Sequence, residues 1–346
     1  MVPTAKRELV HAQDQWSITQ FCAALTNALA GSGPALGIGN ILSTSVSTDV
    51  ALVVTTSGST GTPKEIHLSA AAVTASAKAA NTFLKADAGN SWSLLLPLTH
   101  IAGINVLVRA LLLKSEVLDF RNNSQYTKAD FTAIVPTQLH RALTADHQLL
   151  KHLQEAKAVL VGGAPLAESD KQSAHANGIN VITTYGMSET SGGCIYDGTP
   201  LDGVAVKIVE NIIYLRGPML AQVPLVDGWL KTTDIGRLEN GKLAVFGRAD
   251  DQIISGGEKI SLSVIEQALS ENFESIFLAF AKPDQEWGER LCIATTLELS
   301  QDTISHFLKN RFGGYATPKE IHKVDEIPLI GIGKPDRAKL IERLAK

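Results

Sequence analysis

The sequence predicts an α/β protein with a large N-terminal α/β domain, a small β-rich subdomain and a smaller α+β C-terminal domain. From Asp49 onward, short apolar runs rich in β-branched residues alternate with helical patterns, which is typical of a sheet covered by helices. After Gly198 the alternation gives way to strand, turn and strand patterns. Beyond Gly247 helices and strands return over roughly 100 residues, an ordinary domain size. The predicted domains are 1–249 and 250–346.

Strands and helices alternate through the first domain. A helix is predicted near 17–30, and the rest of the first 48 residues carries signals too weak to assign. Because each apolar run is short enough for a buried strand, strands are predicted at 51–56, 91–97, 131–136, 157–163 and 179–186. Helices are predicted at 69–85, from near Ile101, at 137–145 and at 166–177. Loops at the ends of such strands are where α/β proteins bind ligands.

Two hairpins form the predicted subdomain, at 204–217 and 236–248. The turn is Glu-Asn in "VAVKIVENIIYLRG" and Glu-Asn-Gly in "GRLENGKLAVFGR", each between apolar runs. The C-terminal domain then mixes both kinds of element. Helices are predicted at 263–272, near 303–312 and at 335–346, and strands around 275–281 and 291–299.

Composition favours a cytoplasmic protein that binds small molecules. The 346 residues carry a formal net charge of -4 without a basic stripe, so nucleic acid is not an expected partner. Cys22, Cys194 and Cys292 lie far apart, which argues against a disulfide framework and a zinc site. The N-terminus is polar, and the strongest apolar run, "IAGINVLVRALLL", is too short to span a bilayer, so no membrane insertion is expected.

A loop of glycines and hydroxyls, "TTSGSTGTPKEI" at 55–66, predicts a polyphosphate site. Gly58 and Gly61 allow backbone conformations that point successive N–H groups at one anion. The hydroxyl donors around them are Ser57, Ser59, Thr60 and Thr62. Lys64 follows at a spacing that differs from the Walker pattern, which disfavours a kinase or a motor ATPase. A flexible surface turn is the alternative, since these residue types favour turns.

Five motifs occur in the order found in the adenylate-forming enzymes: "TTSGSTGTPK", "TYGMSET" at 184–190, "TTDIGRL" at 232–238, "GRADDQIISGGEKIS" at 247–261 and "GIGKPDRAKL" at 331–340. The chain resembles this family, which comprises acyl-CoA synthetases, adenylation domains of peptide synthetases and luciferases, over about residues 50 to 346. Segments 96–111 and 183–198 are most similar to members that join o-succinylbenzoate to CoA in menaquinone biosynthesis.

The resemblance implies two half-reactions that use ATP, Mg²⁺ and CoA. A carboxylate attacks the α-phosphate of ATP, and the CoA thiol then displaces AMP from the acyl-adenylate. Lys334 matches the family's lysine that bridges the carboxylate and the α-phosphate, where charge develops. Glu189 matches the carboxylate that holds Mg²⁺, and Ser188 matches a donor to the α-phosphate. Capping of a helix is the alternative role for this segment.

The resemblance also implies a nucleotide pocket. Tyr185, beside Gly186, would stack on adenine, and a core tyrosine is the alternative. Asp234 would accept hydrogen bonds from the ribose hydroxyls, and Arg248 would contact ribose or phosphate. The remaining residues of this pocket are Thr56, Ser57, Gly58, Ser59, Thr60, Gly61, Lys64, Gly162, Gly163 and Ala164.

The acid pocket would lie around His100 and the helix after it. Small residues follow the Glu189 motif and would admit an aromatic ring: Ser191, Gly192 and Gly193. Arg109 lies within an apolar helical run, where a charge needs a partner. It is a candidate to bind the second carboxylate of o-succinylbenzoate, directly or through water, and an internal salt bridge with Asp or Glu is an equal alternative.

The C-terminal domain is expected to be mobile, as in the family. Asp250 matches the hinge about which this domain rotates between the half-reactions, exchanging Lys334 for the "SGGEK" loop at 255–259. Gly256 and Gly257 would admit the narrow pantetheine arm of CoA. A plain acidic turn is the alternative for Asp250.

Two features depart from the family pattern. Only about 50 residues precede the phosphate loop, fewer than in relatives. Either the missing part is dispensable scaffold, or a partner copy covers the exposed sheet edge, which suggests a homodimer. Glu65 stands where a glycine is expected. A carboxylate beside phosphates is unfavourable unless it points away or pairs with Lys64.

Other functions stay open. The chain could be another acyl- or aryl-CoA ligase, or a stand-alone adenylating enzyme that loads a carrier protein. From a different class, it could be a non-catalytic nucleotide-binding relative. The combination of Glu189, Asp234, Arg248 and Lys334 argues against a pure binder, which has no evident need for all four.

Overall fold

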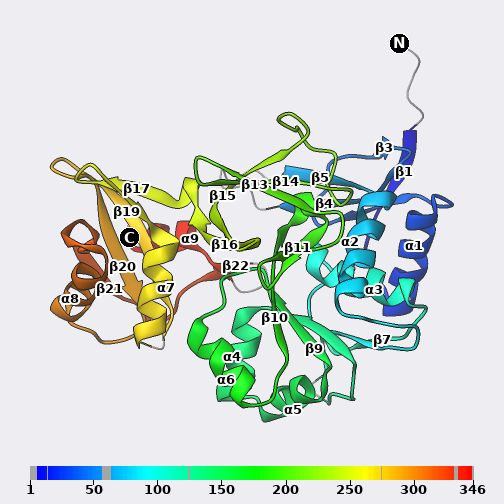
Figure 1. Cartoon of the computed structure of the whole chain (residues 1–346), viewed down its shortest axis with the longest axis horizontal. Helices are drawn as coiled ribbons and strands as arrows, with labels where there is room; N and C mark the ends of the chain where they lie inside the picture. Colours follow the sequence, from blue (N-terminus) through cyan, green and yellow to red (C-terminus); the bar gives the residue numbers. More distant parts are fainter. Residues whose placement is uncertain are drawn as a thin grey trace.

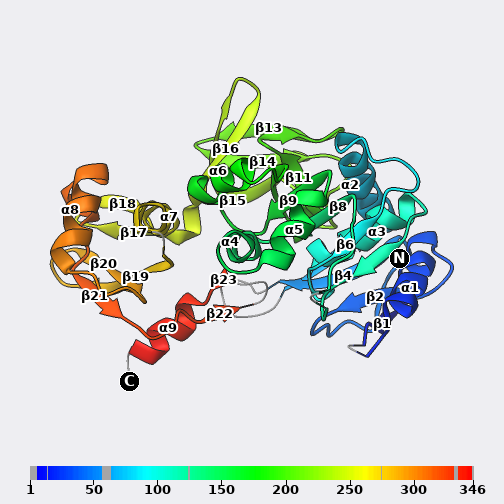
Figure 2. The ribbon, with the colours of Figure 1, turned by 90° about the horizontal axis from the view of Figure 1, so that it is seen from below.

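The structure, a computed structural model, describes residues 6–13, 15–56, 64–123, 125–273, 275–330 and 334–344. Two sheets with their helices form the N-terminal part, residues 6–200, and a four-stranded small sheet spans residues 205–248. The C-terminal module, residues 249–344, lies at the end of the molecule opposite the N-terminal helix (Figure 1, Figure 2). The predicted α/β class, with a β-rich subdomain and a smaller α+β unit, is confirmed.

The first sheet has the strand order β3-β1-β2-β4-β5, with β1, β2 and β4 parallel and the two outer strands antiparallel to them. Its elements are β1 (Lys6–His11), α1 (Ile18–Ala30), β2 (Ala35–Ile38), β3 (Ser45–Ser47), β4 (Val50–Thr56) and β5 (Lys64–Ser69). The predicted helix near 17–30 and strand at 51–56 are confirmed. The strands β1, β2, β3 and β5 were not predicted.

A buried arginine explains why β1 is hard to recognise. The strand alternates exposed and buried residues, but one buried position is Arg7 instead of an apolar side chain. Its guanidinium donates to the backbone carbonyls of Ala28, Gly33 and Val50, each at 2.8 Å. Arg7 therefore joins the C-terminal end of α1 to the sheet, where a positive charge also meets the negative end of the helix dipole.

The second sheet has the order β12-β11-β10-β9-β8-β6-β7, and its strands from β10 to β7 are parallel. Its strands are β6 (Trp92–Leu94), β7 (Val117–Asp119), β8 (Phe131–Ile134), β9 (Ala158–Gly162), β10 (Val181–Met187), β11 (Gly192–Tyr196) and β12 (Thr199–Pro200). The helices are α2 (Ala70–Phe83), α3 (Ile101–Leu112), α4 (Pro136–Thr144), α5 (His147–Glu155) and α6 (Glu168–Ala176). Of these, β7, β11, β12 and α5 were not predicted, and the other elements lie within a few residues of their predicted ranges.

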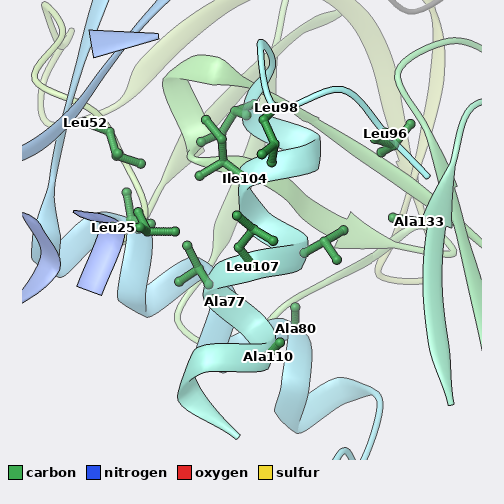
Figure 3. Packing of buried hydrophobic residues seen from close by; sticks show 14 of the residues in the cluster. Leu25, Leu52, Ala77, Ala80, Leu96, Leu98, Ile104, Leu107, Ala110 and Ala133 are labelled. Atoms are coloured by element: carbon green, nitrogen blue, oxygen red, sulfur yellow. The ribbon is translucent and has the colours of Figure 1, made fainter. Parts of the chain in front are cut away.

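Small residues let α2 and α3 pack closely against each other. Figure 3 shows Ala77 and Ala80 of α2 beside Leu107 and Ala110 of α3. All four side chains are fully buried in the largest apolar cluster, which also contains Leu52 of β4. Alanine has high helix propensity, and its methyl side chain is too small to hold the helix axes apart. The alanine-rich segment therefore both favours the helix and allows close packing. This packing fixes α3 in the layer between the two sheets.

The small sheet has the order β13-β14-β15-β16 and confirms both predicted hairpins. Its strands are β13 (Ala205–Val209), β14 (Ile212–Arg216), β15 (Leu230–Glu239) and β16 (Lys242–Arg248). Glu210 and Asn211 have φ of 50° and 63°, and Asn240 and Gly241 have φ of 50° and 78°. Positive φ at both central residues is the type I′ turn, whose twist matches that of paired strands.

The C-terminal module is built on the sheet β18-β17-β20-β19, with β21 paired to β20. Its elements are η2 (Ala249–Asp251) at its start, then β17 (Gln252–Ser255), β18 (Glu258–Ser261), α7 (Leu262–Phe273), β19 (Phe277–Asp284), β20 (Gly288–Thr295), α8 (Gln301–Phe312), η3 (Gly314–Ala316), β21 (Glu320–Lys323), β22 (Leu329–Ile330), β23 (Lys334–Pro335) and α9 (Arg337–Leu344). The three predicted helices and two predicted strands are confirmed, whereas β17, β18 and β21 were not predicted. Within the described ranges, no helix is both long and apolar enough to cross a membrane.

Candidate functional site

The predicted nucleotide residues gather at one edge of the second sheet. Gly162 ends β9 and pairs with Thr184 of the parallel strand β10, one residue before Tyr185. His100 begins α3, which follows β6 of the same parallel set. Because the carboxyl ends of parallel strands meet at one edge, these residues from distant parts of the chain become neighbours. Gly163 and Ala164 follow β9 and are exposed there.

Tyr185, Asp234 and Arg248 come together across two sheets. The Tyr185 hydroxyl donates to Asp234 Oδ2 at 2.6 Å, and Asp234 lies opposite Arg248 in the β15–β16 ladder. The Asp234 N–H donates to the Thr232 hydroxyl at 3.0 Å, and this hydrogen bond holds the backbone of Asp234. Burial and the nearby Asp234 carboxylate raise the pKa of Tyr185, so its phenol stays a hydrogen-bond donor.

Ser188 and Glu189 lie in a short 3-10 turn, η1 (Ser188–Thr190), between β10 and β11. No α-helix follows the turn, and the predicted capping alternative applies only to Thr190, whose hydroxyl accepts from the Met187 N–H at 2.9 Å and so caps the 3-10 turn itself. The Glu189 carbonyl accepts a hydrogen bond from the Ala221 N–H at 2.8 Å. Its half-buried carboxylate forms no hydrogen bond or ion pair with any described residue, which leaves the oxygens available to a cation.

Glycines bring the chain after Glu189 close to β10. Gly186 lies opposite Gly193, beside a bulge in the β10–β11 ladder. A Cβ on Gly186 would lie 2.1 Å from the Gly192 carbonyl oxygen, so only glycine fits. Gly192 has φ of 98°, which glycine adopts without strain. Ser191 and Gly192 are buried and Gly193 is half-buried, beside α3 as the predicted acid pocket requires.

Arg109 lies in the core without an acidic partner among the described residues. Its side chain is 4% exposed and donates to the Tyr196 hydroxyl at 3.1 Å. The guanidinium also lies 5.2 Å from the Trp92 ring centroid, a cation–π contact. The predicted alternative of an internal salt bridge is therefore not formed within these ranges. Nine residues of helix separate Arg109 from His100, about 13 Å at 1.5 Å per residue, so the two occupy opposite ends of α3.

The predicted phosphate loop lies mostly outside the described residues, which omit Ser57, Gly58, Ser59, Thr60 and Gly61. Thr56 and Lys64 pair across the β4–β5 ladder on either side of it, and Lys64 is exposed. The loop therefore connects two antiparallel strands. Strand β5, which follows the loop in the chain, packs against η1, the turn that carries Glu189.

Glu65 points toward an earlier segment of the chain, at Leu42 and Ser43. Its carboxylate accepts hydrogen bonds from the Leu42 N–H at 2.5 Å and from the Ser43 hydroxyl at 2.5 Å, and it lies 3.6 Å from His67. Partial burial opposes ionisation, but these hydrogen bonds lower the pKa of Glu65 overall. The departure from the family glycine thus has a structural explanation that sequence reasoning did not find.

The residues predicted for the second half-reaction lie in the C-terminal module. Lys334 opens β23, which pairs with β22, and in both views this hairpin extends toward the N-terminal part (Figure 1, Figure 2). Asp250 accepts two hydrogen bonds from Arg248, both at 2.7 Å. Gly256 and Gly257 form the two-residue turn of the β17–β18 hairpin, with φ of 60° and 85°.

Sequence reasoning missed several polar residues that support this site: Ser76, Asn105, Thr232 and Arg337. Asn105 is the one amide in the largely apolar helix α3, four residues before Arg109 on the same face, and this amide was the available signal. Thr232 lies two residues before Asp234, within a motif that had already been noted. Ser76 lies in an alanine-rich helix, where a serine is unremarkable, so no local pattern marks it.

A large α/β part with a nucleotide-type site at a sheet edge, joined to a C-terminal module that carries a lysine hairpin, defines an adenylate-forming enzyme. The AMP-binding enzyme family matches residues 8–218, and the AMP-binding enzyme C-terminal domain matches residues 275–334. The chain belongs to the AMP-binding enzyme family.

Among its relatives, a probable 2-succinylbenzoate–CoA ligase of Mycobacterium tuberculosis is 38% identical over 368 residues, covering 93% of this chain and 94% of that protein. A 2-succinylbenzoate–CoA ligase of Haemophilus influenzae is 30% identical, covering 86% of this chain and 71% of that protein. An arginine-to-lysine variant of Escherichia coli MenE with bound OSB-AMS superposes with a TM-score of 0.75 at 25% identity, covering 96% of this chain and 81% of that chain. The O-succinylbenzoate coenzyme A synthetase from Bacillus subtilis, in complex with ATP and magnesium ion, shares the fold with a TM-score of 0.74 at 21% identity, covering 92% and 82%.

Proposed function

We propose that this chain is an ATP-dependent, AMP-forming ligase that joins 2-succinylbenzoate (o-succinylbenzoate) to coenzyme A, a step of menaquinone biosynthesis. The observation that carries the proposal is the 38% identity to a probable 2-succinylbenzoate–CoA ligase, which spans 93% of this chain and 94% of that protein. An alignment of that extent includes both the large N-terminal part and the C-terminal module. The substrate carboxylate would attack the α-phosphorus of ATP, pyrophosphate would leave, and the CoA thiol would then displace AMP.

The Tyr185–Asp234 contact supports a nucleoside site. Its hydrogen bond holds the Tyr185 ring in place for stacking, and Asp234 keeps its second oxygen for the ribose hydroxyls. Arg248, opposite Asp234 in the ladder, adds a cation beside them. The Glu189 carboxylate, which has no partner among the residues that the structure describes, fits Mg²⁺, a hard cation that prefers oxygen ligands and, when bound, supplies positive charge to the phosphates. Ser188 would donate to the α-phosphate from the same turn.

The acid would lie between α3 and the glycines after Glu189. His100 would line its entrance, and the small residues Ser191, Gly192 and Gly193 leave room for an aromatic ring beside α3. In this proposal Arg109 recognises the ring carboxylate directly or through water. Its burial without an acidic partner among the described residues supports this role, because a buried cation gains from an anionic ligand.

The second half-reaction would use the C-terminal module. Lys334 would neutralise the charge that develops at the α-phosphate, and rotation about Asp250 would then withdraw it. The glycine turn at Gly256 and Gly257 would admit the pantetheine arm of CoA. A separation of the chain into mobile domains 1–249 and 250–346, a homodimeric state and a cytoplasmic location belong to the same proposal.

The first experiment is AMP formation by the full chain with ATP, Mg²⁺ and CoA, comparing o-succinylbenzoate with benzoate, a fatty acid and several amino acids. We expect kcat/KM for o-succinylbenzoate to exceed the others by about 100-fold or more, because a site that pairs with a second carboxylate rejects acids that lack it. Turnover of another acid at a similar rate would keep the chemistry and overturn the substrate. ATP binding without pyrophosphate release from any acid would favour a nucleotide-binding relative.

A further inference from the structure

We propose that Asn105 is a positioning residue for adenylation, which acts with Ser76 by holding the carbonyl of Ser191 and thereby fixing the turn that carries Glu189. The inference rests on the proposed function, in which Glu189 holds Mg²⁺. Neither residue would touch substrate. Both would act through the backbone two residues after Glu189.

Two buried side chains from different helices donate to one carbonyl. Asn105 Nδ2 of α3 lies 2.6 Å from the Ser191 oxygen, and Ser76 Oγ of α2 lies 3.0 Å from it. Asn105 is 1% exposed, Ser76 is 3% exposed and Ser191 is fully buried. Because α2 and α3 are packed together by their alanines, the two donors form a rigid clamp.

The clamp holds a backbone that needs support. Ser191 has φ of 52°, a left-handed conformation that is unfavourable for a residue with a side chain. Its carbonyl is removed from water, so without these donors it would be a buried acceptor with fewer hydrogen bonds, which is also unfavourable. The clamp therefore helps to hold the conformation between Glu189 and Gly192, together with the Thr190 hydroxyl. That hydroxyl accepts from the Met187 N–H at 2.9 Å and donates to the Gly192 carbonyl at 2.7 Å.

The amide of Asn105 has one workable orientation. Among the described residues its Oδ1 has no hydrogen-bond partner, and a carbonyl such as that of Ser191 can only accept. The nitrogen must therefore face Ser191. A Cβ on Gly192 would lie 2.1 Å from Asn105 Nδ2, so the amide also fills the space that the next glycine leaves.

The opposite side of the turn is fixed independently. The Ser191 hydroxyl donates to the Met219 carbonyl, and the Ala221 N–H donates to the Glu189 carbonyl, each at 2.8 Å. With one side of the turn held by residues 219–221 and the other by the clamp, loss of the clamp should let the turn pivot. The Glu189 carboxylate would then move relative to the phosphates.

The test is acid-dependent exchange of pyrophosphate into ATP, measured against Mg²⁺ concentration in the full chain and in Asn105→Leu, which removes the donor at similar volume. We expect the Mg²⁺ concentration for half-maximal exchange to rise about tenfold, the effect of about 1.4 kcal/mol. Asn81→Leu is the matched control. Asn81 is 6% exposed and, like Asn105, donates from its amide to a backbone carbonyl, here that of Arg109. The Oδ1 of Asn81 also has no hydrogen-bond partner among the described residues.

Both leucine variants should lose thermal stability, but only Asn105→Leu should change the Mg²⁺ dependence. Ser76→Ala, a smaller change, should shift it in the same direction by a few fold and serves if Asn105→Leu does not fold. A Mg²⁺ dependence that stays at the wild-type value in both clamp variants would overturn the role of Asn105.

Failure of the proposed function gives a different result. If the wild-type chain exchanges no pyrophosphate with any acid, calorimetric binding of a non-hydrolysable ATP analogue at several Mg²⁺ concentrations replaces the exchange assay. A shift of that Mg²⁺ dependence in Asn105→Leu, and not in Asn81→Leu, would support the clamp without ligase activity. Absence of any Mg²⁺-dependent nucleotide binding by the wild type would overturn both proposals.

Discussion

Asn105, Arg109 and His152 lie buried in the N-terminal part, and each is held by uncharged groups: the Ser191 carbonyl, the Tyr196 hydroxyl and the Ser93 hydroxyl. In and just before the C-terminal module, charged groups pair with one another instead. Arg248 pairs with Asp250, and Arg337 of α9 pairs with both Asp251 and Glu266.

The two kinds of contact respond differently to conditions. Hydrogen bonds to uncharged groups in a dry interior fix geometry and are little affected by salt, whereas ion pairs that water can reach are screened and can exchange partners. A site that must bind nucleotide in one arrangement suits the first kind. The rotation proposed at Asp250 suits the second kind, because the exposed contact between Arg248 and Asp250 can break and re-form at low cost.

The largest effect is expected for Lys334, the lysine of the C-terminal module that is predicted to act in adenylation. Lys334→Ala should lower adenylation by about 100-fold or more, as expected for loss of a cation at a developing charge. Thioesterification of preformed acyl-adenylate should remain nearly intact. Single-turnover assays of each half-reaction measure the two steps. Equal loss of both steps would contradict a role of Lys334 in adenylation alone.

Next comes the buried arginine. Arg109→Met keeps most of the side-chain volume but removes the charge, so kcat/KM for o-succinylbenzoate should fall at least about tenfold more than for an analogue that lacks the ring carboxylate. Steady-state kinetics with both acids give this ratio. If both acids suffer alike, the contacts of Arg109 with Tyr196 and Trp92 are purely structural.

A smaller effect is expected from the ion pairs within the C-terminal module. Arg337→Met leaves Asp251 and Glu266 without their shared partner, so the C-terminal module should lose about 1–3 kcal/mol of stability, less than a fully buried pair would. Hydrogen exchange of α7 and β19 measures the loss. Arg343→Met on the same helix breaks only an exposed pair with Glu326 and should cost under about 1 kcal/mol.

High salt should reproduce part of the Arg337→Met effect in the wild type, because ion pairs are screened. Protection of α2 and α3 should change little under the same salt. Equal sensitivity of both regions would remove the contrast between neutral and charged contacts.

The last expected effect is an opposite response to pH in the two regions. Burial raises the pKa of Glu266 to about 7, although the Arg337 charge opposes this. The folded module thus keeps a proton that the unfolded chain releases above 4.5, so its stability should fall, by on the order of 1–3 kcal/mol, as pH rises through 4.5 to about 7. Glu266→Gln should flatten this slope in melts of the full chain.

Burial lowers the pKa of His152, so the unfolded chain takes up a proton that the folded N-terminal part does not. Stability of that part should therefore fall as pH drops below 6.5, and His152→Gln should remove the dependence. Melting curves of the two variants between about pH 5 and about pH 8 separate the effects. Parallel slopes in both variants would show that other groups dominate.

Most of the fold could be predicted from local pattern, because apolar periodicity and turn residues act within a few positions. The hairpins at Glu210 and Asn240 were found for that reason. The strands near the N-terminus were not, since β1 buries Arg7 through carbonyls that lie 21, 26 and 43 residues away. No local pattern records such partners.

The candidate site divides in the same way. Its motif residues could be named from the sequence. In the structure three of them lie together, because Asp234 pairs with Arg248 across the ladder and accepts a hydrogen bond from Tyr185. The clamp could not be predicted, because Ser76 and Asn105 meet Ser191 only after two helices and a sheet have packed. The predicted roles of Lys334, Gly256 and Gly257 stay predictions.

The direction of Glu65 has a consequence for the history of the family. Its carboxylate binds the Ser43 hydroxyl and the N–H groups of Leu42 and Ser43, so the two positions form one unit across 22 residues of chain. Lineages that carry an acid at position 65 should retain a hydroxyl at 43, and those with glycine at 65 should be released from that requirement. The two positions are thus expected to have changed together during evolution.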